Sequence, residues 1–286
     1  MMKHGAYKEM GTKMLKNLVS LLILSFAVTG YAEIKAVPLN NKCTPDYVTT
    51  IDSNNECLRL ISDNETKTPD ELVIYLHGDY CLGGASYMSE VASDFKKSTR
   101  LNIALIRPGY FDDLGNFSTG NSLGVTNTKI AGRLNNYTQE NIHIIGQAIQ
   151  NLKNHYKPKR LLIVGHSGGA AIAALLLNEF PNLADGALLI NCPCDVKRWR
   201  PDWDKSLSPI EHISQIPTKT VVHLIAGAAD DAVSPELSKA YAEALAKKGI
   251  RVQFYFGIGM AHNLTDKKTK EMSLEAIETF LKTFNP

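Results

Sequence analysis

The segment at residues 159–179, KRLLIVGHSGGAAIAALLLNE, constrains the fold of this chain more than any other. Its apolar run Leu161 to Val164 is typical of a buried strand, and its alanine- and leucine-rich second half is typical of a buried helix. Only the stretch Gly165 to Gly169 separates the two, so the chain must turn sharply there. Glycine allows helix and strand to approach closely because it has no side chain. The segment therefore predicts a strand, a tight turn and a buried helix.

Ser167 lies in the middle of this turn, with glycine two positions before it and two after it. This spacing is that of the nucleophile elbow, in which a strained backbone projects a serine hydroxyl out of the turn. The next backbone N–H, that of Gly168, is expected at a helix N-terminus, where unpaired donors and the helix dipole stabilise a developing negative oxygen. Ser167 is the candidate nucleophile and Gly168 a candidate oxyanion-hole donor. The alternative is a strand-to-helix turn without chemistry.

Strand and helix patterns alternate along the chain without an obvious linker, which predicts one α/β domain. The unbroken apolar run at 71–76 is typical of a strand buried on both faces of a parallel sheet. At 286 residues and 44% hydrophobic the chain can bury one large core, and a net charge of +2 with scattered lysines and arginines argues against a nucleic-acid partner. Two short antiparallel strands are expected at the sheet edge, at 47–51 and 58–61. Further strands are expected at 71–76, 101–106, 185–191, 220–226 and 252–256, with helices at 86–97, 138–156, 235–248 and 268–284.

The N-terminus has the features of a secretory signal peptide. Lys13 and Lys16 precede an apolar run at 18–28, which is short for a membrane span. Gly30-Tyr31-Ala32 then places small residues at the two positions that signal peptidase recognises, so cleavage is expected after Ala32. We expect a signal at 1–32, with a non-native or upstream start at 1–13, and a single exported domain at 33–286, secreted or periplasmic and without a membrane span after cleavage. The alternative is an uncleaved anchor helix.

An oxidising compartment permits disulfides, and all five cysteines lie after the signal. Cys43 and Cys57 flank a predicted hairpin and are expected to close it. Cys81 follows one strand and is expected near Cys192 or Cys194, which follow another. A direct bond between Cys192 and Cys194 is expected to be strained and therefore disfavoured. A metal site there lacks a second ligand pair of familiar spacing, so no metal is predicted.

The oxyanion hole needs a second donor, and His77-Gly78 ends a buried strand at a suitable place. A sharp turn there directs the next backbone N–H toward the nucleophile. We expect Asp79 to supply that donor, with Tyr80 as second choice. The alternative is a strand-ending turn with a structural histidine.

A reactive serine also needs a base and an acid. The hydroxyl is a poor nucleophile until an imidazole takes its proton, and an acid must fix the imidazole's tautomer. Asp230 lies on the loop after the strand at 220–226, and His262 lies on the loop after the next strand. Asp231 is the fallback for the acid. Four other histidines are weaker bases because they lie in or beside regular elements: His143, His155, His212 and His223.

This chain order of serine, aspartate and histidine, with an upstream His-Gly loop, resembles the α/β-hydrolase superfamily from residue 72 to the C-terminus. The resemblance implies a mostly parallel eight-stranded sheet with helices on both faces, and a triad at the strand ends. The double glycine after Ser167 is similar to the prolyl-oligopeptidase-like and serine-aminopeptidase-like branches. No propeller domain is present in the sequence, which excludes a large gated peptidase.

Two segments are expected to cover the site as insertions. Residues 110–137 form a long polar loop with little periodicity, which is uncommon unless functional. Residues 192–207 carry Trp199 and Trp203, whose rings either meet substrate or pack the insertion onto the body. The candidate substrate contacts are Tyr80, Tyr110, His166, Trp199 and Trp203.

Together these residues predict a secreted serine hydrolase, most simply a carboxylesterase acting on a small or medium acyl ester without a cofactor. A small exopeptidase or amidase of the same fold is the alternative, because the same triad attacks esters and amides. It would need an acid to hold a free amino terminus, for which the candidates are Asp79, Asp112, Asp113, Asp195 and Asp202. Outside enzymes, the alternative is a catalytically silent binding protein.

Overall fold

The computed structural model describes residues 43–62, 66–79, 85–120 and 137–284. The expected signal peptide, Tyr80, Cys81 and positions 121–136 of the expected long loop lie outside these residues. No helix within the described ranges is long and apolar enough to cross a membrane.

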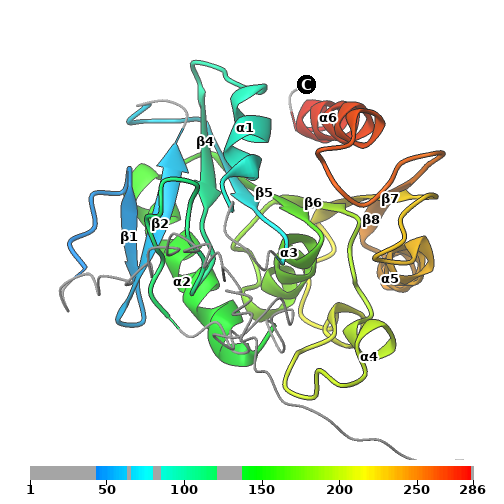
Figure 1. Cartoon of the computed structure of the whole chain (residues 1–286). Helices are drawn as coiled ribbons and strands as arrows, with labels where there is room; N and C mark the ends of the chain where they lie inside the picture. The colour runs from blue at the N-terminus through cyan, green and yellow to red at the C-terminus, as the bar shows by residue number, and fades with distance from the viewer. Residues whose placement is uncertain (1–42, 63–65, 80–84, 121–136, 285–286) are drawn as a thin grey trace, which may run out of the picture. The chain divides into compact units, whose positions relative to one another are not determined.

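Eight strands and six α-helices alternate through the described ranges (Figure 1). The strands are β1 Thr50–Ser53, β2 Glu56–Ser62, β3 Glu71–Leu76, β4 Arg100–Leu105, β5 Arg160–His166, β6 Gly186–Ile190, β7 Val221–Gly227 and β8 Arg251–Gly257. The helices are α1 Tyr87–Ser93, α2 Gln139–Tyr156, α3 Gly168–Glu179, α4 Val196–Trp199, α5 Pro235–Lys247 and α6 Lys267–Lys282, with a short 3₁₀ helix at Pro209–Glu211.

The strands form a single eight-stranded sheet in the order β1-β2-β4-β3-β5-β6-β7-β8. From β4 to β8 every neighbouring pair is parallel, and only β1 with β2 and β2 with β4 are antiparallel. The predicted mostly parallel sheet is therefore confirmed. Parallel strands end at the same edge of a sheet, so the loops after β3, β5, β7 and β8 meet at one edge.

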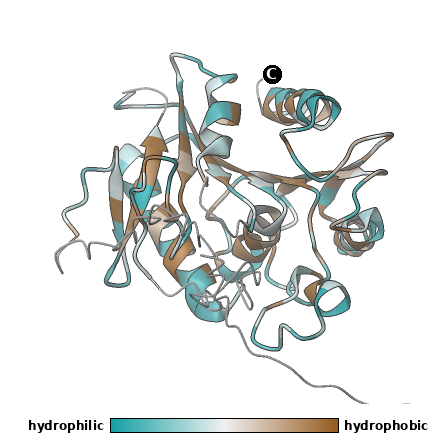
Figure 2. Ribbon diagram, in the orientation of Figure 1, coloured by the Kyte–Doolittle hydropathy of each residue, from teal (hydrophilic) through white to brown (hydrophobic). Residues whose placement is uncertain are grey.

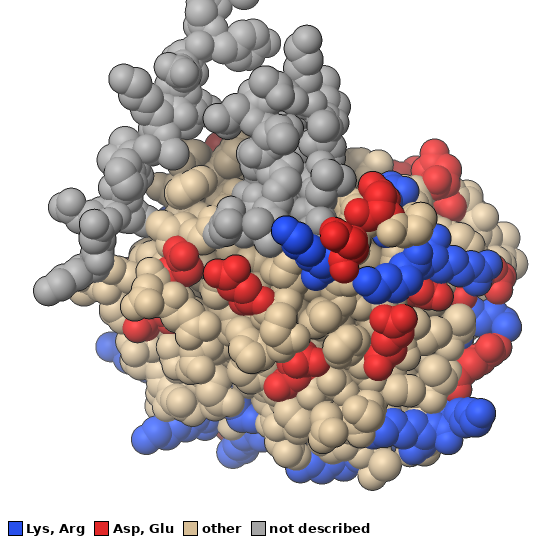
Figure 3. Space-filling view, turned by 90° about the horizontal axis from the view of Figure 1, so that it is seen from below, with Lys and Arg blue, Asp and Glu red and all other residues tan. Residues whose placement is uncertain are grey.

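Helices cover both faces of the sheet, as the resemblance to the α/β-hydrolase superfamily implies (Figure 1). Helices α2, α3 and α5 pack on one face and share a core cluster, whereas α1 and α6 pack on the other face with a second cluster. The central strands are apolar on both sides and are coloured brown in Figure 2, which is typical of parallel strands between helices. The face in Figure 3 carries Lys, Arg, Asp and Glu side chains of both signs.

The first hairpin and the first helix differ in length from expectation. Strand β1 begins three residues later than predicted, and β2 extends to Ser62 because it pairs antiparallel with β4. Helix α1 ends at Ser93, four residues early, because Lys97 pairs with Arg100 and the chain turns there into β4. Helix α2 begins after Thr138, whose hydroxyl accepts from the backbone of Asn141 as a cap.

Two disulfides form among the described cysteines. The predicted pair Cys43–Cys57 is present, and its Cα atoms lie 5.2 Å apart. The expectation for the other pair is wrong, because Cys192 and Cys194 bond to each other and neither sulfur is left for Cys81. A fully extended chain would separate their Cα atoms by about 7 Å. The turn after β6 instead brings them to 5.1 Å, within ordinary disulfide reach.

Candidate active site

Ser167 occupies the turn between β5 and α3 in a strained backbone conformation. Its φ is 53°, a region that side-chain-bearing residues rarely adopt. Its backbone N–H donates to the carbonyl of Ile190 on β6 at 2.8 Å. A side chain at Gly169 would come within 2.2 Å of the Leu76 carbonyl oxygen, so glycine there lets α3 begin directly against β3. The neighbouring strands thus hold the serine in a conformation that it would not adopt alone.

The structure brings Ser167, His262 and Asp230 together. The Nε2 atom of His262 lies 3.0 Å from the Ser167 Oγ, and its Nδ1 atom lies 2.8 Å from Asp230 Oδ2. The carboxylate only accepts, so Nδ1 carries the proton and Nε2 is left to accept from the serine hydroxyl. This is the arrangement of an activated serine.

Asp230 and Asp231 are adjacent in sequence but differ in position. The Asp230 side chain is fully buried, and its Oδ1 accepts from the backbone N–H groups of Ala232 at 2.9 Å and Val233 at 2.8 Å. Asp231 is exposed. These bonds turn the loop after β7 so that the other oxygen of Asp230 faces the imidazole of His262.

Asn191, which the sequence analysis did not single out, joins the two loops that carry the acid and the base. Its Oδ1 accepts from the N–H of Gly227 at 2.9 Å, and its Nδ2 donates to the carbonyls of Ala261 at 2.9 Å and His262 at 3.1 Å. Its φ of 50° is one that asparagine tolerates better than most residues. The only sequence signal was its place at the end of a buried strand beside the elbow.

The two residues that carry the candidate oxyanion donors, Gly168 and Asp79, lie in contact. Gly168 is the first residue of α3, where a backbone N–H has no partner within the helix. No described group accepts from the N–H of Asp79. The Asp79 carboxylate rests against Gly168, since a Cβ atom there would lie 2.3 Å from Asp79 Oδ1. Tyr80, the second choice, lies outside the described residues.

The Asp79 carboxylate is held by a buried arginine and two tyrosines. Arg107 Nη2 lies 2.9 Å from Oδ1, the Tyr137 hydroxyl donates to Oδ2 at 2.5 Å, and the Tyr110 hydroxyl lies 3.4 Å from Oδ1. Burial, and then the negative charge of Asp79, raise the pKa of Tyr137. Burial opposes the charge of Arg107, but Tyr110 and Asp79 outweigh it and raise the pKa of the guanidinium.

His77 has a structural place in this loop rather than facing the nucleophile. Its Nε2 atom accepts from the backbone N–H of Arg107 at 3.0 Å, so its Nδ1 donates to the carbonyl of Gly78 at 2.8 Å. The Arg107 side chain also donates to the His77 carbonyl at 3.0 Å. Together these bonds fix the turn that carries Asp79.

The carboxylates considered for holding an amino terminus are otherwise engaged or exposed. Asp79 pairs with Arg107, Asp112 pairs with Arg59 at 3.3 Å, and Asp195 caps α4. Asp113 and Asp202 are exposed.

The tryptophan-bearing insertion packs against the site loops. Trp203 is buried, and its ring centroid lies 5.6 Å from that of Tyr137 and 5.5 Å from that of Trp199. The Trp199 indole N–H donates at 2.8 Å to the carbonyl of Ala232, in the loop of the acid. Both rings therefore pack the insertion onto the body, and substrate contact for them and for the buried Tyr110 stays a prediction.

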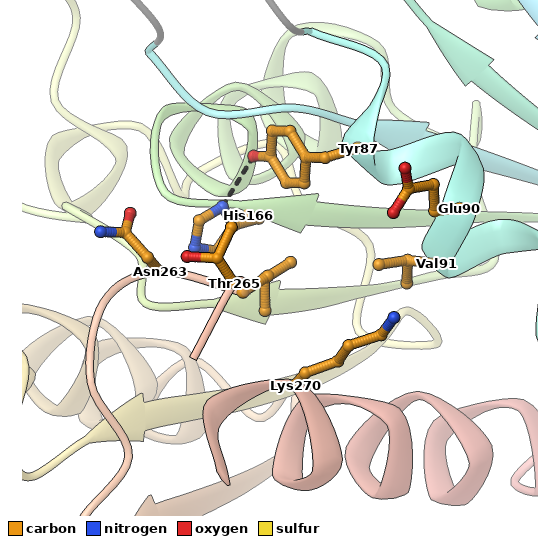
Figure 4. A pocket seen from close by; sticks show the side chains of 8 residues that line it. Tyr87, Glu90, Val91, His166, Asn263, Thr265 and Lys270 are labelled. Atoms are coloured by element: carbon orange, nitrogen blue, oxygen red, sulfur yellow. Dashed lines mark hydrogen bonds between the residues drawn. The ribbon is translucent and has the colours of Figure 1, made fainter. Parts of the chain in front are cut away.

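His166, the residue before Ser167, is buried and lies beside Tyr87 (Figure 4). Its Nδ1 atom lies 2.7 Å from the Tyr87 hydroxyl, and its Nε2 atom lies 2.9 Å from the His262 carbonyl oxygen. Burial, and then the nearby His262, lower its pKa from 6.5 to about 4. The ring also lines a cavity of about 260 Å³ between α1 and α6, with Glu90 and Lys270 on its walls.

Because His166 and His223 are buried, we expect the free energy of unfolding to fall in mild acid. Burial lowers the pKa of His166 to about 4, and burial with the nearby charge of Arg251 does the same for His223. Both are neutral in the folded state, and the unfolded chain takes up their protons first, near pH 6.5. The stabilisation is complete above that pH and is lost as pH falls toward 4, by about 2 kcal/mol per histidine at about pH 5.

Urea unfolding at about pH 7 and about pH 5 measures this loss. His223 is the better residue to change because it lies away from the site, and its Nδ1 has no hydrogen-bond partner among the described residues. The variant His223→Leu should lose less stability between the two pH values than the wild type. Equal losses in the two proteins would contradict the assignment for His223.

The sequence model of the family described as Phospholipase/Carboxylesterase matches residues 56–285, most of the chain. The chain belongs to this family. It is therefore an esterase-type hydrolase of the α/β-hydrolase superfamily, in agreement with the predicted resemblance.

Solved esterases share the fold of this phospholipase/carboxylesterase family member at low sequence identity. An esterase of Pyrococcus furiosus matches with a TM-score of 0.61 and 20% identity over 82% of this chain and 90% of its own. Est1E of Butyrivibrio proteoclasticus, with bound ferulic acid, matches at 0.62 and 15% over 82% and 98%. The carboxylesterase of Bacillus cereus matches at 0.52 and 18% over 78% and 94%. Comparison with curated proteins gave no match.

Proposed function

We propose that this protein is an exported serine carboxylesterase that cleaves a small or medium acyl ester through Ser167, His262 and Asp230. The observation that carries the proposal is the continuous hydrogen-bonded line from the serine hydroxyl through the imidazole to a buried carboxylate, at 3.0 and 2.8 Å.

In the proposed reaction, the Ser167 oxygen attacks the ester carbonyl as its proton passes to His262 Nε2. Asp230 stabilises the imidazolium that forms and keeps its ring in place. The imidazolium then gives its proton to the departing alcohol oxygen, which leaves an acyl-serine. A water molecule then attacks the acyl carbon as His262 Nε2 takes its proton. The imidazolium returns that proton to the Ser167 oxygen, which releases the acid and restores the hydroxyl.

The negative oxygen of the tetrahedral intermediate needs donors that are already in place. In this proposal the backbone N–H groups of Gly168 and Asp79 supply them, from a helix start and from a loop fixed by Arg107. The Asp79 carboxylate lies close to Gly168, and an unpaired negative charge there would disfavour the oxyanion. Its pairing with Arg107 offsets that charge.

An ester is favoured over a peptide because no described carboxylate of the candidate set is both beside the nucleophile and free to bind an ammonium group. Asp79 lies beside it but is paired with Arg107. The test compares p-nitrophenyl esters of increasing acyl length with aminoacyl p-nitroanilides on the purified protein. Hydrolysis of short and medium esters without anilide hydrolysis is expected. Faster turnover of anilides would replace the esterase assignment with the exopeptidase one.

Export is proposed from the signal-like N-terminus, and the disulfide pairs Cys43–Cys57 and Cys192–Cys194 support it, because such bonds persist in oxidising compartments. N-terminal sequencing of the protein recovered outside the cytoplasm should give Glu33 as the first residue. A first residue at position 1 or 14 would contradict cleavage.

A further inference from the structure

A row of hydrogen bonds joins the loop after β3, which carries Gly78 and Asp79, to the loop after β8, which carries His262. The backbone N–H of Gly78 donates to the Tyr87 hydroxyl at 2.6 Å, and this hydroxyl lies 2.7 Å from His166 Nδ1 (Figure 4). His166 Nε2 lies 2.9 Å from the carbonyl oxygen of His262. We propose that Tyr87 and His166 are positioning residues, which hold the oxyanion donor and the base in register with Ser167.

This proposal rests on the proposed esterase function and adds two residues to it. Neither side chain is part of the serine, acid and base. Tyr87 comes from α1, on the face of the sheet opposite α3, and His166 is the last residue of β5.

The two ends of the row fix the direction of every bond in it. The Gly78 N–H can only donate, so the Tyr87 oxygen accepts there and its own proton is directed to His166 Nδ1. A carbonyl can only accept, so His166 carries its proton on Nε2 and donates to His262. The neutral Nε2–H tautomer of His166 is therefore the one form that satisfies both neighbours.

The row controls position because its ends lie close to the reacting groups. Gly78 packs against the nucleophile, since a Cβ atom there would lie 3.1 Å from the Ser167 Cβ and 3.3 Å from the Tyr87 hydroxyl. The next residue, Asp79, carries the proposed oxyanion donor. A shift of the loop at Gly78 therefore moves that donor relative to the serine.

At the other end, the row restrains the backbone of the base. The His262 carbonyl oxygen receives two donors, His166 Nε2 and Asn191 Nδ2. Loss of the first leaves one donor and removes the link to α1. Misplacement of a catalytic group by about 1 Å costs on the order of 100-fold in rate, so a loosened loop should lower kcat.

The first test is Tyr87→Phe with Tyr241→Phe as the matched control. Tyr241 is buried and Tyr87 is partly buried, and the Tyr241 hydroxyl has no hydrogen-bond partner among the described residues. We expect Tyr87→Phe to lower kcat on a p-nitrophenyl ester by about 10- to 100-fold with KM within about threefold. Tyr241→Phe should keep the wild-type kcat. Equal kcat values for the two variants would overturn the proposal.

The second test separates the bonds of His166 from its volume. In His166→Gln, the amide offers an acceptor toward Tyr87 and a donor toward His262, whereas His166→Met fills similar space with neither. Glutamine is expected to keep kcat within about tenfold of the wild type, and methionine is expected to lose about 100-fold. Equal kcat values in the two variants, each with wild-type thermal stability, would show that only the volume matters and would overturn the proposal.

The outcomes also separate this proposal from the function on which it rests. A wild-type protein that hydrolyses none of the esters would refute the esterase function. A wild-type protein that is active, with Tyr87→Phe as active as Tyr241→Phe, would leave the esterase function intact and refute only the positioning role.

Discussion

Replacement of Ser167 with alanine should lower kcat on p-nitrophenyl esters by about 10⁴- to 10⁶-fold, to the residual rate that oxyanion donors and binding alone provide. The reason is that the Oγ at 3.0 Å from His262 Nε2 is the atom that forms the acyl-enzyme in this mechanism. Steady-state hydrolysis measures the loss, and a fluorophosphonate probe reports the same oxygen directly.

The control for Ser167→Ala is Ser93→Ala, which removes an exposed hydroxyl from the end of α1. Ser93→Ala should label with the probe and turn over ester as the wild type does. Continued labelling of Ser167→Ala would show that another residue is the nucleophile. A wild-type protein that neither labels nor turns over would support the silent binding protein instead.

Asp230→Asn should lower kcat by about 10⁴-fold, although the substitution changes almost no volume. The Oδ1 of residue 230 accepts from two backbone N–H groups, at Ala232 and Val233, so an asparagine is expected to keep its oxygen there. Its NH₂ group then faces His262 Nδ1 and requires that atom to accept. The imidazole proton moves to Nε2, which can no longer take the proton of the serine.

Asp231→Asn is the matched control, because it makes the same chemical change one residue away on an exposed side chain. It should keep kcat within about twofold, since an exposed charge at this distance has little effect on the triad in water. Equal activity losses in the two variants would contradict the assignment of Asp230 as the acid.

The parts of the site that the sequence predicted are those with a local pattern. The turn around Ser167 was predictable because a strand, closely spaced glycines and a helix are contiguous. The places of Asp230 and His262 followed from strand order, because loops after parallel strands meet at one edge. The seven-residue strand β8 was also found, although it lies at the sheet edge and is partly exposed.

The parts that were missed depend on contacts between distant segments. Asn191 matters because Gly227 and His262 come to it, and nothing near it in sequence indicates this. The Cys192–Cys194 bond was expected to be too strained to form, but the backbone after β6 brings the two Cα atoms within 5.1 Å of each other. Tyr87 looks like any aromatic residue of an amphipathic helix until β5 places His166 beside it.

The separation of Ser167 from His262 by 95 positions bears on how the protein is made. His262 lies on the loop after β8, the last strand in the chain. In the proposed mechanism, a nascent chain that has already formed the turn around Ser167 therefore still lacks the base that activates the hydroxyl. During refolding, covalent capture by a phosphonate should therefore lag behind the recovery of helical circular dichroism. In the proposed mechanism, the newly made polypeptide therefore hydrolyses no ester until the segment that carries His262 has docked.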